Sequence, residues 1–123
     1  MIRKILLILA ITSAAFACNG KKSYESVNAE QFATALATQQ PQIIDARTPE
    51  EFQQGHIPGA QNIDVKSSDF DTLISTLDKS RPVAVYCRSG SRSKMAAERL
   101  VSAGFNVVEL DGGILSWEGE IAK

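Results

Sequence analysis

The feature that most constrains the fold is an alternation of short apolar, β-rich runs with segments of helical periodicity. The β-rich runs occupy residues 42–47, 83–86 and 105–110. Between them, residues 69–77 and 93–103 carry apolar side chains at helical spacing. Strands that alternate with helices favour a parallel sheet covered on its faces by those helices. We therefore predict an α/β three-layer sandwich with a mostly parallel central sheet.

Capping residues mark where two further helices begin. Asn28 with Gln31, and Thr48 with Glu51, have the spacing of capping boxes, and Pro49 suits the first position of a helix. These signals predict one helix that runs to about residue 38 and a second, short one that starts at Pro49. The buried side of the helix over 93–103 is predicted to consist of Met95, Ala96, Leu100 and Val101.

Length and composition limit the classes of protein to be considered. The chain has 123 residues, which is room for one domain. Its net charge of −1 gives no basis for sustained nucleic-acid binding. The two cysteines and the single histidine exclude a disulfide framework and a metal centre rich in Cys or His. The predicted domain is large enough to act as a monomer, which is the state we expect.

The N-terminus has the parts of an export signal. Arg3 and Lys4 precede an apolar run over residues 5–11, and small residues flank Phe16 just before Cys18. The run is too short for a membrane-spanning helix, which needs about 20 residues. We predict that residues 1–17 are a signal peptide.

Cys18 stands directly after the predicted cleavage position, and this arrangement resembles the lipobox of bacterial lipoproteins. The resemblance implies that Cys18 is lipidated and that residues 18–23 form a polar tether to a domain over 24–123. The protein would then be a membrane-anchored lipoprotein facing the periplasm. Ala15 and Phe16 depart from the usual lipobox residues, so ordinary cleavage to a soluble periplasmic protein is the alternative.

The candidate site is the segment from Cys87 to Ser93, between a predicted strand and a predicted helix. Ligands of open α/β sheets bind at such strand ends, where loop N–H groups and a helix N-terminus favour negative charge. Gly90 permits a tight concave loop, and Arg88 and Arg92 add positive charge. A thiol there should have a lowered pKa, so we predict that Cys87 is a nucleophile. The alternative is a small buried side chain that only fills space.

Several short motifs, taken in order, resemble a single-domain rhodanese, a sulfurtransferase module. The resemblance covers roughly residues 24–119, and the candidate loop shows no departure from it. The motifs that carry it are Ile44–Arg47, Glu51-Phe52, Gly55–Ala60, Asn62-Ile63, Val85–Ser93, Ala96-Ala97 with Leu100, Gly104-Phe105, and Gly112-Gly113 with Trp117.

The resemblance implies a chemistry for this loop. Cys87 would take sulfur from a donor such as thiosulfate or a polysulfide, hold it as a persulfide, and pass it to a thiol or to cyanide, without metal or organic cofactor. The residues implied to bind the substrate are Arg88, Ser89, Gly90, Ser91 and Arg92. A non-catalytic module of the same fold, which senses sulfur species or binds a partner, is the alternative.

Cysteine-dependent phosphatases resemble this site but place five residues between Cys and Arg, whereas four lie between Cys87 and Arg92. The shorter loop disfavours a phosphatase.

Arg92 has two interpretations: it binds the donor anion, or it ties the loop to a carboxylate such as Asp45. Asp45 and Arg47 are expected to hold neighbouring loops, since a carboxylate close to a thiolate would oppose its ionisation.

Overall fold

The computed structural model describes residues 21–123 and contains a five-stranded, all-parallel sheet. The spatial order of the strands is β1-β5-β4-β2-β3. Their bounds are β1 Tyr24–Val27, β2 Gln42–Asp45, β3 Gln61–Asn62, β4 Val83–Tyr86 and β5 Val107–Leu110. The helices are α2 Ala29–Gln39, α3 Pro49–Gln54, α4 Phe70–Ile74, α5 Ser91–Ser102 and the short 3-10 turn η1 Ile114–Ser116.

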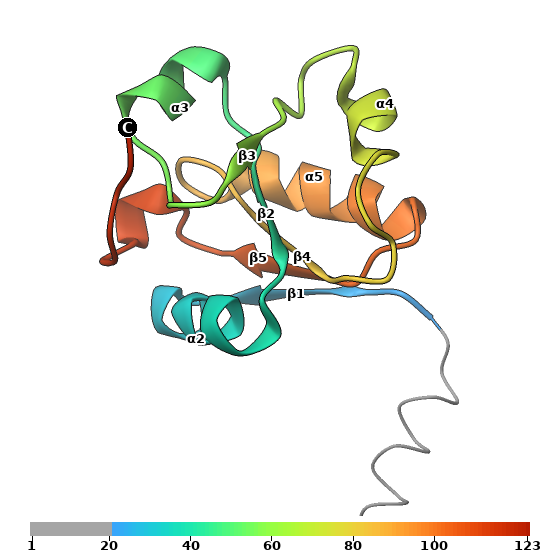
Figure 1. Cartoon of the computed structure of the whole chain (residues 1–123), viewed down its shortest axis with the longest axis horizontal. Coiled ribbons are helices and arrows are strands. Elements are labelled where there is room, and N and C mark those ends of the chain that lie inside the picture. The colour runs from blue at the N-terminus through green and yellow to red at the C-terminus, as the bar shows by residue number, and fades with distance from the viewer. Residues whose placement is uncertain (1–20) are drawn as a thin grey trace, which may run out of the picture.

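The sheet divides the interior into two apolar clusters because successive strand residues point to opposite faces. On one face, Val83 and Val85 pack with Leu100 of α5 and Phe70 of α4. On the other face, Ala84, Tyr86 and Leu110 pack with Phe32 of α2. Figure 1 shows α2 on one side of the sheet, with α4 and α5 on the other. The predicted three-layer α/β sandwich is confirmed.

Both predicted capping boxes are present. Asn28 Oδ1 accepts the Gln31 N–H at 2.8 Å, while Gln31 Oε1 accepts the Asn28 N–H at 3.1 Å. Thr48 and Glu51 make the equivalent pair of bonds at 3.2 and 3.0 Å. These reciprocal bonds satisfy N–H groups that a helix start otherwise leaves without a partner.

Two features of the fold were not predicted correctly. Strand β1 was missed, because Tyr24–Val27 is short and lies at the edge of the sheet, where it pairs only with β5. Of the residues predicted to form the buried side of α5, Met95 is 45% exposed and Val101 is only partly buried. The buried face of α5 is Ser93, Ala96, Ala97 and Leu100, at i, i+3, i+4 and i+7, and Met95 points away from that face.

The predicted signal peptide over 1–17 and the predicted lipidation site Cys18 lie outside the described residues. Within residues 21–123, none of the helices has the length and apolar content needed to cross a bilayer.

Candidate functional site

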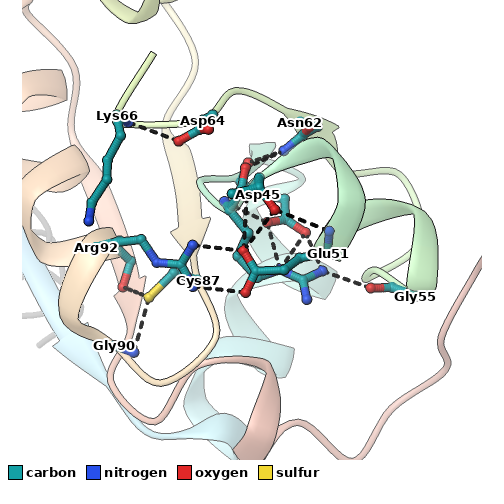
Figure 2. Close-up of polar contacts among 12 residues, drawn as sticks. Asp45, Glu51, Gly55, Asn62, Asp64, Lys66, Cys87, Gly90 and Arg92 are labelled. Carbon is teal, nitrogen blue, oxygen red and sulfur yellow. Dashed lines mark hydrogen bonds and ion pairs between the residues drawn. The ribbon is translucent and has the colours of Figure 1, made fainter.

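Cys87 follows the carboxyl end of the central strand β4 and begins the loop that leads into α5. Its side chain is buried, and its Sγ accepts the Gly90 N–H at 3.1 Å (Figure 2). Burial raises the pKa of this thiol, but hydrogen bonding with the Ser93 side chain and from the amides of Ser93, Gly90 and Ser89 outweighs this effect. The net effect is a lowered pKa, as the sequence predicts for a loop whose N–H groups converge on the sulfur.

Gly90 gives the loop the conformation that directs its N–H at the sulfur. Its φ is 110°, in the left-handed region that glycine adopts without strain. A Cβ at this position would lie 1.9 Å from the Asp111 carbonyl oxygen. The loop after β5 therefore presses directly against the loop that holds Cys87, and only glycine fits between them.

Arg92 does not reach toward open solvent from the loop. Its guanidinium donates two hydrogen bonds to the Glu51 carboxylate of α3, from Nη1 to Oε1 at 2.7 Å and from Nη2 to Oε2 at 3.0 Å (Figure 2). The hydrogen bond to Arg92 lowers the pKa of Glu51 to about 2. The interpretation that Arg92 ties the loop to a carboxylate thus agrees with the structure, but the suggested partner Asp45 was wrong.

Asp45 is instead paired with Arg47, at 2.7 Å between Oδ2 and Nη2. The same nitrogen of Arg47 donates to the Gly55 carbonyl at 2.7 Å, and Asn62 donates to the Asp45 and Arg47 carbonyls. These contacts join β2, the end of α3 and β3 beside the site (Figure 2). The prediction that Asp45 and Arg47 hold neighbouring loops is confirmed.

Arg88 and Ser89 are exposed on the loop that follows Cys87, and Ser91, the first residue of α5, is exposed as well. The backbone of the loop is fixed from the C-terminal side as well, since Ile114 N–H donates to the Cys87 carbonyl at 2.9 Å and Leu115 N–H to the Arg88 carbonyl at 3.2 Å. Among residues 21–123, no group of three or more His, Cys, Asp or Glu side chains is placed to hold a metal ion. The site offers one buried sulfur in a rigid ring of N–H donors.

Comparison with known protein families identifies relatives of this chain. The model of the rhodanese-like domain matches residues 28–120. The chain belongs to the rhodanese-like family. A sulfurtransferase of Allochromatium vinosum is 37% identical over 93 residues, which covers 74% of this chain and 85% of that protein. The thiosulfate sulfurtransferase GlpE of Pseudomonas fluorescens is 42% identical over 89 residues, which covers 71% of this chain and 79% of that protein.

Solved structures agree on the fold of this rhodanese-like domain. A rhodanese-related protein from Thermoplasma volcanium has a TM-score of 0.71 at 30% identity, covering 80% of this chain and 98% of that one. The rhodanese-like domain of an Anabaena protein has a TM-score of 0.69 at 31% identity, covering 79% of this chain and 77% of that one.

The rhodanese-like domain also has site residues that the sequence-based prediction missed. Glu51 was predicted only as a helix cap, whereas it also holds Arg92. Ser93 contacts the sulfur at 3.4 Å, and behind it lies the completely buried Glu109. A signal for Glu109 was present, since it is the only charged residue in the run Val107–Leu110. Its position on the α5 side of the sheet could not be inferred before the register of β5 was known.

Proposed function

We propose that this protein is a sulfurtransferase that carries sulfane sulfur as a persulfide on Cys87. The observation that carries the proposal is the Cys87 sulfur held by the Gly90 N–H and the neighbouring loop amides. Such a ring of donors stabilises a thiolate, and it would equally stabilise the negative terminal sulfur of a persulfide. The names of the relatives in the family support the same reaction class.

The proposed reaction consists of two displacements at sulfur, and it needs no external oxidant or reductant. The Cys87 thiolate attacks the outer sulfur of thiosulfate and forms a new S–S bond. The S–S bond of thiosulfate breaks, and sulfite leaves with its electron pair. A thiol or cyanide then attacks the terminal sulfur of the persulfide, and the Cys87 thiolate is released. Covalent catalysis of this kind divides one difficult transfer into two easier steps.

Arg88 is the residue that we propose to meet the donor anion. It is exposed beside Cys87 in the loop, whereas the guanidinium of Arg92 is occupied by Glu51. Arg92 would then assist from a distance, by fixing the loop through its ion pair with Glu51. A dianion such as thiosulfate is attracted by exposed positive charge at the mouth of a site.

The proposal is tested by intact-mass spectrometry of the full chain carrying Cys18→Ala, so that Cys87 is its only thiol. Incubation with thiosulfate should add one sulfur atom, about 32 Da, and later addition of cyanide should remove it. The matched control carries Cys87→Ser in addition and should gain nothing. A reduced, folded protein that gains no mass from thiosulfate or from polysulfide would instead support a module that binds without transferring sulfur.

We further propose that the sulfurtransferase is exported and anchored by a lipid on Cys18. The support is the order of basic, apolar and small residues before Cys18. The topology is compatible with an anchor, because Tyr24 at the start of β1 pairs with Val107 at the start of β5. The described chain therefore enters the sheet at the amino ends of the parallel strands, whereas Cys87 follows the carboxyl end of β4.

Cell fractionation of the natural chain and of Cys18→Ala tests the anchor. The natural chain should be found with the membranes, and Cys18→Ala should be found in the soluble periplasmic fraction. A natural chain that is already soluble in the periplasm would support ordinary signal cleavage, and a variant that stays with the membranes would contradict lipidation.

A further inference from the structure

Glu109 is a buried acid that the proposed sulfur transfer does not use. It lies in β5 with 0% of its surface exposed, on the face of the sheet that α5 covers. An ionised carboxylate in such a position is costly unless it is paired and hydrogen-bonded. Packing alone therefore does not explain why a glutamate occupies this position.

The partners of Glu109 come from β1 and from the first turn of α5. Ser26 of β1 and Ser93 of α5 each donate a hydroxyl hydrogen to it, and Lys94 Nζ lies 3.3 Å from Oε1. Lys94 is shared with the exposed Asp111, at 2.7 Å. The other charged pair at the site is Arg92 with Glu51. Glu109 is thus the buried carboxylate that lies nearest to Cys87 along the hydrogen bonds, separated from it by Ser93 alone.

Ser93 connects the two groups but has only one hydroxyl hydrogen. Its Oγ lies 3.4 Å from the Cys87 Sγ and donates to Glu109 Oε2 at 2.5 Å. While Ser93 donates this hydrogen to Glu109, its oxygen can accept a hydrogen bond from the Cys87 thiol, but the hydroxyl cannot donate one to a Cys87 thiolate. Ser93 can stabilise the thiolate only by turning its hydrogen away from Glu109.

We propose that Glu109 is a positioning residue that controls the ionisation of Cys87 through the single hydroxyl hydrogen of Ser93. While Cys87 is a thiol, the Ser93 hydroxyl donates its hydrogen to Glu109 and is not available to the sulfur. The negative charge of Glu109 also lies only two hydrogen bonds from the sulfur. Both effects oppose the loop amides, which favour the thiolate. The balance keeps the thiol from becoming a weak, permanently ionised nucleophile, since attacking thiols are best when their pKa is near the ambient pH.

The test is the rate of alkylation of Cys87 by iodoacetamide as a function of pH, in full chains that carry Cys18→Ala. In Glu109→Gln the negative charge is removed, so the midpoint of the rate profile should fall by about one pH unit. The matched control is Asp111→Asn, which makes the same chemical change on the other partner of Lys94 but outside the contact with Ser93. Its midpoint should stay within about 0.2 units of the parent chain.

Ser93→Ala separates action through the hydroxyl from a simple effect of charge. It removes the donor to the thiolate, so the midpoint should rise by about one unit. In the Ser93→Ala background, Glu109→Gln should shift the midpoint by half as much or less, because only the charge effect is left. If Glu109→Gln does not fold, Glu109→Asp, which withdraws the carboxylate from Ser93 and keeps the charge, should give a smaller fall.

A midpoint that is unchanged or higher in the folded Glu109 variant would overturn the inference, and so would an equal shift in Asp111→Asn. The inference rests on the proposed role of Cys87 as the nucleophile, yet alkylation needs no sulfur transfer. A shifted midpoint in a chain that gains no sulfur from thiosulfate would leave the inference standing and remove the proposed function. Normal sulfur uptake with an unshifted midpoint would do the reverse.

Discussion

Replacing Gly90 by alanine should damage both the fold and the thiol, and Gly104 provides a matched comparison. The two glycines have similar φ angles, 110° and 105°, in the region that favours glycine. They differ in their surroundings. A Cβ on Gly90 would lie 1.9 Å from the Asp111 carbonyl oxygen, whereas a Cβ on Gly104 would meet only the Lys79 side chain at 3.8 Å. The pair therefore separates the cost of conformation from the cost of collision.

Gly104→Ala should lower the free energy of unfolding by about 1–2 kcal/mol, the cost of a left-handed backbone with a side chain. Gly90→Ala should lower it by about 3–5 kcal/mol, because the collision with backbone adds to the same conformational cost. On a domain of this size the difference corresponds to roughly 10 °C in Tm. The shift of the loop should also lengthen the 3.1 Å contact from the Gly90 N–H to the sulfur and raise the pKa of Cys87.

Urea unfolding followed by circular dichroism gives the two free energies, and alkylation against pH gives the two thiol profiles. Gly104→Ala should keep the alkylation profile of the parent chain, since its contacts lie at the far end of α5. Equal destabilisation of the two variants, or an unchanged thiol profile in Gly90→Ala, would refute the reasoning that the Asp111 carbonyl holds this loop in place.

Three further outcomes are expected. Glu51→Gln should lower the free energy of unfolding in urea by about 1–2 kcal/mol at neutral pH. Because the folded-state pKa of Glu51 is lowered to about 2, this difference from the parent chain should be present above about pH 4.5 and vanish as the pH falls toward 2. Tyr86→Phe should cost about 1–3 kcal/mol, because the buried Ile57 N–H loses its acceptor at 3.0 Å; no change in urea midpoint would contradict this. Cys87→Ser should change stability by less than about 1 kcal/mol, and a larger loss would show that the sulfur also supports packing.

Local signals in the sequence were sufficient wherever a few neighbouring residues decide the structure. The capping boxes at Asn28 and Thr48 depend on side chains that bond within one helical turn. The strand over 83–86 is apolar throughout because both of its faces are covered, and this can be recognised without a structure. The position of Cys87 between that strand and a helix follows from the same two signals.

Contacts between distant segments were beyond the reach of the sequence. Strand β1 pairs with β5, which lies some 83 residues later in the chain. Four residues, of which only Tyr24 and Val27 favour strands, are too short a signal to predict it. Arg92 had two open interpretations until α3 was seen to bring Glu51 to it, across 41 residues. Neither pairing leaves a local pattern, because it depends on how helices and strands pack.

The class of fold and the position of the loop that carries Cys87 could be inferred from the sequence alone, because periodicity, capping and turn chemistry depend on consecutive residues. Which charged groups lie near the sulfur depends on contacts between distant segments and became known from the structure. Glu109 reaches Ser93 because β5 lies beside β4 and under α5, with its side chain on the α5 face. Electrostatic interactions act through space, so the groups that tune Cys87 are defined by the packing of the layers.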